Sequence, residues 1–483
     1  MRLAMAAAEA VPFAKTGGLA DVIGALPQAL ARLPDVQVCV FLPYHKIIRE
    51  NETVQVEFLQ SFPVDLAWRK QHVGLFRLSR STPDCTVYFI DNRQYFDRDG
   101  LYGELDDGER YAYFSKAVLE SMVQLGLQAD ILQCHDWHTA LIPVFLNAQY
   151  RSSFPKLKTV FTIHNILFQG WAEPYFCADV LGLPQEYTDV LRHEGAVNMM
   201  KGAIVSADAV TTVSETYAKE IRFSYFGEGL SELLCRYGHK LSGIVNGIDD
   251  MLWNPAHDRR IFAPFSPDTL EQKKDNKRAL QQRLCLPQKE TTPVLAMITR
   301  LTEQKGIDLL QWIAPQLLRQ DVQLVILGTG EARYERYFSQ LQYLYPEKVS
   351  ANLFFGGDLA NQIYAGADLF LMPSRTEPCG IAQMIAMRYG AVPVVHETGG
   401  LKDTVPAYNK EIEQGLGFTF QSYNADDFLA AIERALELYY WDHDKWLRLM
   451  RADMEQDFSW GRSAQNYVQL MKRLLTSETT LEG

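Results

Sequence analysis

Residues 2–22 read RLAMAAAEAVPFAKTGGLADV, an apolar run followed by a lysine, two adjacent glycines and the start of an amphipathic pattern. The apolar run at 2–8 predicts a buried strand, and apolar side chains at helical spacing predict a helix over 19–33. Gly17 and Gly18 let the backbone approach a ligand, the N-terminus of the helix adds positive potential, and Lys15 supplies a mobile charge. The stretch therefore predicts an anion-binding loop; a tight turn beside a solvated lysine is the alternative.

Short apolar runs alternate with longer helical patterns along the chain, which is typical of β-α-β units in parallel sheets. A polar, proline-bearing segment at 246–293 separates two such series. We therefore expect an α/β protein with two Rossmann-like domains, 1–246 and 247–458, that face each other across a deep cleft, and a helix in 459–483 that packs back on the first domain. Ligands of open α/β sheets bind beyond the carboxyl ends of the strands, so the chemistry is expected in the cleft. The expected strands lie at 2–8, 36–42, 86–90, 130–134, 158–163, 208–213, 293–298, 322–327, 353–355, 368–372 and 392–395.

The composition is that of a folded protein with an acidic charge balance. Hydrophobic residues make up 47% and charged residues 22% of the 483 positions, and 47 Lys and Arg against 59 Asp and Glu give a net charge of −12. This charge disfavours nucleic acids and anionic membranes as partners. No apolar run reaches the ~18 residues that span a bilayer, and the first run is too short and interrupted for a signal peptide. The cysteines are scattered without a C-x-x-C, which supports neither a disulfide framework nor a structural zinc site.

Two strand ends in the second series carry charged loops. ITRLTEQKG at 298–306 places Arg300 and Lys305 directly after a predicted strand, where a planar guanidinium and a point charge can bracket a diphosphate; solvated surface cations are the alternative. MPSRTEPCGIAQ at 372–383 places Glu377 in a loop before a helix that starts near Gly380. Its carboxylate can hold sugar hydroxyls while the amides of the helix take a phosphate.

Polar loops also follow or end strands elsewhere in the chain. HDWH occupies 135–138, TIHN occupies 162–165, and VNGID occupies 245–249. His164 alone indicates a structural histidine, but three polar loops at strand ends point to ligand binding.

Two other kinds of site are disfavoured. His135 and His138 have no third ligand at a recognisable spacing, so we expect no metal. GTG at 328–330 follows a predicted strand, but Arg333 stands where a dinucleotide fingerprint needs its last glycine. NAD binding is therefore not expected.

Taken together, these loops resemble those of the bacterial glycogen synthases and plant starch synthases, which are glycosyltransferases of the GT-B fold. KTGGL at 15–19 matches the K-x-G-G-L signature of that family. HDWH, TIHN, NGID, RLTEQKG, EPCG and the TGGLKDTV at 398–405 follow in the family's order. The resemblance extends from Met1 to about residue 475.

The resemblance implies an ADP-glucose:1,4-α-D-glucan 4-α-D-glucosyltransferase. Such an enzyme transfers glucose from ADP-glucose to the non-reducing end of an α-1,4-glucan, such as glycogen or a maltooligosaccharide. We expect retention of anomeric configuration and no metal or other cofactor. No transit peptide precedes Met1, which favours a cytoplasmic bacterial enzyme, and the oligomeric state stays open.

The resemblance also implies roles for individual residues. Lys15, Gly17 and Gly18 would lie at the donor diphosphate and glucose, Arg300 and Lys305 would neutralise the diphosphate, and Glu377 would hold the glucose hydroxyls. The catalytic group would be His164, Arg300, Lys305 and Glu377; the donor would also contact Asp21, Asn246, Cys379 and Gly380; the acceptor would contact Glu9, Tyr95, Asp136, Trp137, His138 and Asn165.

Two positions depart from the pattern of related enzymes. Ile385 stands eight positions after Glu377, where other glycosyltransferases carry a second Glu that starch and glycogen synthases generally lack. Asp99 stands where a proline is common in the loop at 95–103. Three other readings remain: a glucan phosphorylase-like enzyme, a nucleotide-sugar epimerase, and an inactive glucan-binding homologue. For the reaction itself, same-face attack assisted by the departing phosphate ranks above a double displacement through Glu377.

Overall fold

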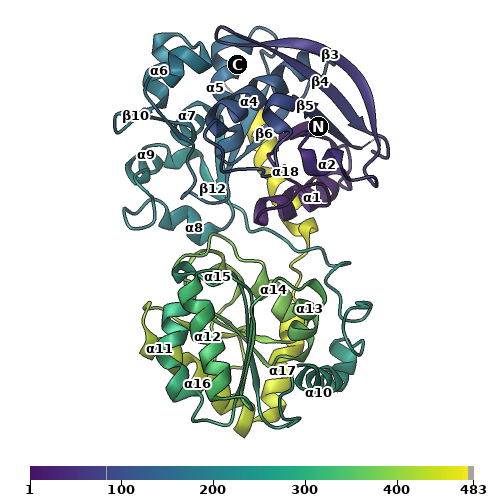
Figure 1. Ribbon diagram of the computed structural model, residues 1–483, viewed down its shortest axis with the longest axis vertical. Helices are drawn as coiled ribbons and strands as arrows, with labels where there is room; N and C mark the ends of the chain where they lie inside the picture. The colour runs from purple at the N-terminus through teal and green to yellow at the C-terminus, as the bar shows by residue number, and fades with distance from the viewer. Residues whose placement is uncertain (83, 477–483) are drawn as a thin grey trace. The chain divides into compact units, whose positions relative to one another are not determined.

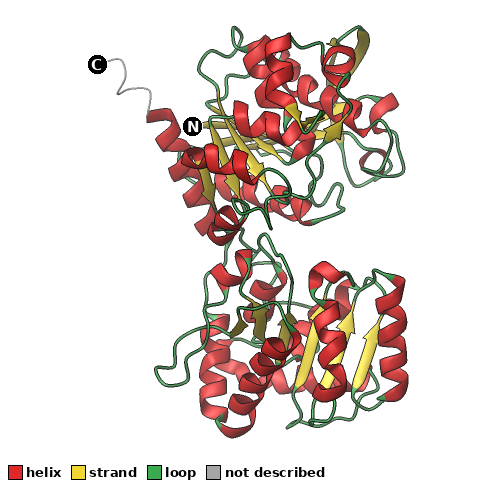
Figure 2. Cartoon of the chain, turned by 90° about the vertical axis from the view of Figure 1, so that its left-hand side faces the viewer, coloured by secondary structure: helices red, strands yellow, loops and turns green. Residues whose placement is uncertain are grey.

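The computed structural model describes residues 1–82 and 84–476. The chain forms two compact units, one made of residues 1–247 with the segment from Trp460 onward and the other made of residues 248–459. In each unit, helices cover the faces of a largely parallel sheet (Figures 1 and 2). Ten of the eleven expected strands are confirmed within two residues of the expected bounds.

The first unit is built on a sheet whose described strands run in the order β12-β11-β7-β6-β1-β2-β5-β4-β3. The strands from β12 to β5 pair in parallel, and β4 and β3 continue the sheet in antiparallel pairing. A small second sheet has the order β8-β10-β9. The elements are β1 Arg2–Ala6, α1 Gly18–Ala31, β2 Gln37–Pro43, α2 Lys46–Arg49, β3 Val56–Leu66, β4 Arg69–Leu78, β5 Cys85–Asp91, α3 Arg93–Phe96, α4 Asp107–Gln124, β6 Ile131–His135, α5 Leu141–Phe145, β7 Lys158–Ile163, β8 Trp171–Ala172, α6 Gln185–Leu191, β9 Arg192–His193, β10 Ala196–Asn198, α7 Met199–Ser206, β11 Ala209–Thr212, α8 Glu215–Glu220, α9 Ser231–Arg236, β12 Leu241–Gly243 and α18 Trp460–Thr476.

The second unit is built on a parallel sheet with the order β15-β14-β13-β16-β17-β18. Its first strand in the chain, β13, lies in the middle of the sheet, so the loops after β13 and β16 leave from neighbouring strand ends. Across the described ranges of both units, no helix combines the length and the apolar content needed to cross a membrane. The elements are α10 Lys273–Arg283, β13 Val294–Ile298, α11 Ile307–Leu317, β14 Gln323–Leu327, α12 Ala332–Leu344, β15 Val349–Asn352, α13 Gly357–Gly366, β16 Leu369–Met372, α14 Ala382–Arg388, β17 Val392–His396, α15 Gly399–Thr404, β18 Phe418–Phe420, α16 Ala425–Trp441 and α17 His443–Met454.

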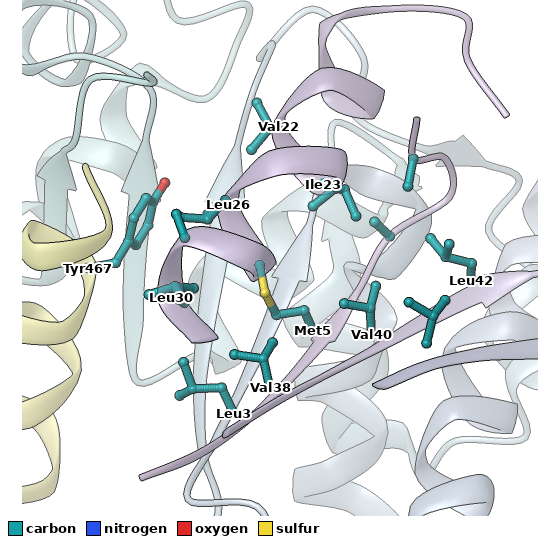
Figure 3. Packing of buried hydrophobic residues seen from close by; sticks show 14 of the residues in the cluster. Leu3, Met5, Val22, Ile23, Leu26, Leu30, Val38, Val40, Leu42 and Tyr467 are labelled. Atoms are coloured by element: carbon teal, nitrogen blue, oxygen red, sulfur yellow. The ribbon is translucent and has the colours of Figure 1, made fainter. Parts of the chain in front are cut away.

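The core of the first unit fixes helix α1, and with it the glycine loop. Val22, Ile23, Leu26 and Leu30 recur at three- and four-residue spacing, so they form one apolar stripe that packs against β1 and β2. Tyr467 of α18 lies beside Leu26 and Leu30 in the same cluster (Figure 3). The expected helix over 19–33 is confirmed, and the two packing surfaces give its N-terminus at Gly18 a fixed position.

The expected strand at 353–355 is wrong. Strand β15 ends at Asn352, and the side chains of Phe354 and Phe355 are 49% and 78% exposed. The apolar run therefore lies on the surface after the strand, while the strand itself carries the mixed sequence VSAN. The long hairpin of β3 and β4 carries no continuous apolar run, because its buried and exposed side chains alternate over much of its length, and the sequence reading missed it.

Candidate functional site

The glycine loop between β1 and α1 is anchored by Glu9. This carboxylate is 3% exposed, and its Oε2 accepts hydrogen bonds from the backbone N–H of Thr16 and, at 2.7 Å, from the Thr16 hydroxyl. Burial raises the pKa of Glu9, although hydrogen bonds from the backbone of Thr16 and Gly17 oppose that shift. The predicted acceptor residue Glu9 thus holds the loop that leads into α1.

Lys15 and Asp21 form an ion pair at the entrance to α1. Lys15 Nζ lies 2.6 Å from Asp21 Oδ1, and the two side chains are 51% and 38% exposed. Asp21 lies in the first turn of the helix, where a carboxylate is stabilised by the helix dipole. Exposed ion pairs contribute little to stability. A ligand that offers Lys15 a phosphate oxygen can therefore displace Asp21 at small cost.

The ends of β6 and β7 bring HDWH and TIHN together. The two strands pair in parallel, with His135 beside Thr162. Asp136 Oδ1 accepts the backbone N–H of His164 at 2.7 Å, and Asp136 also accepts a hydrogen bond from the backbone of Asn165. Burial raises the pKa of Asp136 to about 7. Its φ of 57° with ψ of −177° is a backbone conformation that a residue with a side chain rarely adopts, and such strain is found at ligand-binding sites.

His164 is held from its ring as well as from its backbone. Its Nε2 lies 2.9 Å from Nδ1 of His135, and the side chain of His164 is half-buried. Burial lowers the pKa of His164 to about 3, so its imidazole is neutral at pH 7. A neutral imidazole offers one N–H donor and one nitrogen acceptor.

Two other predicted residues, His138 and Tyr95, are buried in the core, and a third, Trp137, is half-buried. The ring of His138 stacks on Tyr102 at 4.5 Å between ring centroids and lies 4.2 Å from the ring of Trp137. Tyr95 is 1% exposed, and its hydroxyl donates to Glu109 Oε1 at 2.6 Å. His138 and Tyr95 thus belong to the aromatic core behind the loops, while Trp137 is half-buried.

Asn246, which is predicted to contact the nucleotide-sugar donor, lies on the last segment of the first unit. Its side chain is 6% exposed, and no residue in the described ranges donates a hydrogen bond to its Oδ1. A buried amide oxygen without a partner is uncommon in a folded protein, and a ligand that donates a hydrogen bond would satisfy it.

In the second unit, the loops after β13 and β16 converge on Glu377. Lys305 Nζ donates to Glu377 Oε2 at 2.6 Å, and Ser374 Oγ donates to the same oxygen at 2.9 Å. The backbone N–H of Arg375 donates to the Gln304 carbonyl at 2.9 Å, which ties the two loops together. Arg300 is exposed, and no side chain in the described ranges pairs with its guanidinium. A buried carboxylate and two cations thus lie on adjacent loops.

A third loop supports the one that carries Glu377. The backbone N–H of Gly400 donates to the Glu377 carbonyl at 3.1 Å. A Cβ on Gly399 would lie 1.9 Å from the Glu377 carbonyl oxygen, and a Cβ on Gly400 would lie 2.0 Å from that of Cys379. Only glycine fits these two positions. The segment at 398–405 therefore packs its backbone against the loop that carries Glu377, Cys379 and Gly380, and supports that loop.

The sequence reading missed Ser374 and His396. Ser374 lies in the stretch MPSRTEPCGIAQ at 372–383. Its hydroxyl, three positions before the carboxylate of Glu377, is the feature of the sequence that could have identified it. His396 ends β17, with Nδ1 2.8 Å from the Ser374 carbonyl and Nε2 3.2 Å from the Gln421 carbonyl. Nothing in its sequence context marked it. Within residues 1–82 and 84–476, no group of three or more His, Cys, Asp or Glu side chains is placed to hold a metal ion.

Comparisons with known proteins show the family of the chain. The family described as the starch synthase catalytic domain matches residues 2–236, and the family described as glycosyl transferases group 1 matches residues 281–448. The glycogen synthase of Bacillus cereus (strain ATCC 10987) is 47% identical over 481 residues, which cover 98% of this chain and 100% of that protein. The glycogen synthase of Anoxybacillus flavithermus is 46% identical over 479 residues, which cover 98% of each chain.

Solved structures show the same kinship. The catalytic domain of starch synthase IV from Arabidopsis thaliana, bound to ADP and acarbose, has a TM-score of 0.89 and 35% identity and covers 98% of this chain and 99% of that one. The sucrose-phosphate synthase of Thermosynechococcus elongatus, at 17% identity and a TM-score of 0.61 over 99% of each chain, shares the fold. The fold is the α/β GT-B fold that the resemblance implied. The chain belongs to the glycogen synthase and starch synthase family of glycosyltransferases.

Proposed function

We propose that the chain transfers glucose from ADP-glucose to the non-reducing end of an α-1,4-glucan, with retention of anomeric configuration. The contact of Lys305 and Ser374 with Glu377, with the exposed Arg300 on the same loop as Lys305, is the observation that carries the proposal. Two adjacent loops thus carry cations that can bind a diphosphate and a carboxylate that can bind sugar hydroxyls. The ADP in the starch synthase IV structure supports an adenosine diphosphate leaving group.

Cleavage of the glucose–phosphate bond builds negative charge on ADP and positive charge on the sugar. In the proposed reaction, Arg300 and Lys305 stabilise the leaving diphosphate. Cations that are already in place stabilise developing charge without a reorganisation cost. These cations take the part that a metal ion plays in other transferases, and we propose that no metal cofactor is needed.

Glu377 acts in this proposal as a binding carboxylate and not as a nucleophile. Its Oε2 already accepts from Lys305 and Ser374, and two donors on one oxygen reduce its nucleophilicity. The departing phosphate oxygen then takes the proton of the acceptor hydroxyl, and the hydroxyl attacks the same face that ADP leaves. Same-face attack retains the anomeric configuration.

The proposal is tested with radiolabelled ADP-glucose and UDP-glucose, each supplied with glycogen. We expect label to enter the glucan from ADP-glucose, and the new linkages to be α-1,4 by the anomeric proton coupling in NMR. Arg300→Ala and Glu377→Ala should abolish most of the incorporation. Lys410→Ala, which removes only an exposed ion pair with Glu437, is the matched control and should retain it. No incorporation from either donor would overturn the proposal.

A further inference from the structure

His135 is a buried histidine that the proposed reaction does not use. It ends strand β6, its side chain is 0% exposed, and its Nδ1 lies 2.9 Å from Nε2 of His164. Its own Nε2 is buried and has no hydrogen-bond partner among the residues that the structure describes. Among the described residues, Nδ1 of His135 thus contacts only His164, and Nε2 of His135 has no hydrogen-bond partner.

Only one proton lies between the two rings, and its placement decides the tautomer of both. If His164 donates from Nε2, the remaining proton of His135 sits on its Nε2 and becomes a buried N–H without an acceptor. If His135 donates from Nδ1, its Nε2 is a lone pair without a donor, and every N–H of the pair that is buried has a partner. Orphaned buried N–H groups are rarer in proteins than under-satisfied acceptors. The second arrangement is therefore favoured.

Both imidazole rings are neutral at pH 7. Burial lowers the pKa of His164 to about 3 and holds the pKa of His135 well below its usual range. The backbone of His164 is fixed separately, because its N–H donates to Asp136 Oδ1 at 2.7 Å. The ring contact with His135 thus controls the orientation and tautomer of His164, and the contact with Asp136 controls where its backbone lies.

We infer that His135 is a positioning residue that donates its Nδ1–H to His164 and thereby keeps His164 as the tautomer protonated on Nδ1. His164 then presents an N–H donor to a hydroxyl or ring oxygen of the reacting sugar, rather than a lone pair. The inference rests on the proposed function only in that His164 contacts the sugar. The tautomer itself is a property of the free protein.

The tautomer is measured by long-range ¹⁵N–¹H NMR of the full chain labelled at histidine nitrogen, with His164 assigned by loss of its signals in His164→Gln. We expect Nδ1 of His164 to be protonated in the unaltered protein. Detection of the tautomer protonated on Nε2 would overturn the inference, whatever the enzyme activity. If the tautomer is as expected but no glucose is transferred, the proposed function fails and the positioning role stands.

Substitutions at His135 separate positioning from packing. An Asn amide nitrogen falls close to Nδ1 of a histidine, whereas a Gln amide nitrogen falls close to Nε2. We expect His135→Phe and His135→Gln to lower kcat by about 10²-fold, comparable to the loss of one preorganised hydrogen-bond donor, with little change in KM. His135→Asn should restore most of kcat and the tautomer protonated on Nδ1.

His45→Gln is the control for the loss of a buried imidazole, because His45 bonds the Ala8 carbonyl and not His164. It should leave the tautomer of His164 unchanged. Equal kcat in the Asn and Gln variants at equal melting temperature would overturn the inference. If His135→Phe does not fold, the comparison of Asn with Gln and the tautomer of the unaltered protein still decide it.

Discussion

Lys305 Nζ lies 2.6 Å from Oε2 of Glu377, and the two residues come from loops that are 72 positions apart in the chain. Ser374 Oγ donates to the same oxygen, and no residue in the described ranges donates to the other one, Oε1. One carboxylate oxygen is therefore bound by protein donors, and in the proposed function Oε1 is the oxygen that accepts from a sugar hydroxyl. Because the protein donors bind only one oxygen of Glu377, substitutions of Glu377 and of Ser374 should lower kcat by different amounts.

Glu377→Gln should lower kcat by about 10²- to 10³-fold, comparable to the loss of one preorganised electrostatic group. The amide keeps the shape of the side chain but removes the charge that holds Lys305. Ser374→Ala removes one of two donors to Oε2 and should have a smaller effect, about tenfold. Initial rates at saturating donor and glucan measure both. A larger loss in Ser374→Ala than in Glu377→Gln would contradict this division of roles.

Arg300→Ala should affect activity and leave stability unchanged. The guanidinium is exposed and pairs with no side chain in the described part of the chain, so its removal breaks no folded-state contact. Exposed substitutions of this kind change the unfolding free energy by less than about 0.5 kcal/mol. We expect kcat to fall by about 10²-fold or more and the melting temperature to stay the same. A fall in melting temperature together with kcat would indicate a structural role instead.

Most of the parallel strands could be predicted because they are covered by helices and read as apolar runs, whereas β12, β15 and β18 are short or of mixed sequence and were not predicted. The hairpin of β3 and β4 could not, because an edge hairpin needs only one buried face and its side chains alternate. The same reliance on apolar runs produced the wrong strand at 353–355, where Phe354 and Phe355 are on the surface. Hydrophobicity along the chain does not distinguish a buried aromatic from an exposed one.

The loops of the site could be predicted for a related reason, since parallel strands place their carboxyl-terminal loops at one edge of a sheet. The contacts within the loops could not. The partner of Glu9 is the backbone of its own loop, and the ring of Tyr95 is packed in the core. The contact between His135 and His164 could not be read from the sequence, because the two rings are 29 positions apart and meet only in the folded chain.

Removal of metal ions tests the proposed chemistry of the leaving group. Dialysis of the protein against EDTA should leave kcat within about twofold, because Arg300 and Lys305 are fixed cations that need no metal to neutralise a diphosphate. The rate of transfer from ADP-glucose to glycogen is measured in metal-free buffer before and after addition of Mg²⁺ or Mn²⁺. A loss of activity that either ion restores would contradict the proposal.

Asp453 should make the protein less stable as the pH rises. Its side chain is 0% exposed, and neither carboxylate oxygen has a partner among the described residues. Burial holds the pKa of Asp453 well above its usual range, so the folded state keeps a proton that the unfolded state releases above about pH 4. The unfolded state then binds fewer protons, and the free energy of unfolding falls as the pH increases.

Asp453→Asn has no ionisable group at this position, so its free energy of unfolding relative to the unaltered protein should be higher at pH 8 than at pH 5. The gap should widen by up to about 1.4 kcal/mol per pH unit, because the unfolded state has lost a proton that the folded state keeps. Urea unfolding at the two pH values measures it. Asp444→Asn, on the exposed first turn of the same helix α17, is the matched control and should change stability by the same amount at both pH values because its side chain stays in solvent in the folded state. If the two variants show the same pH dependence, the carboxyl of Asp453 is not held in its protonated form by burial.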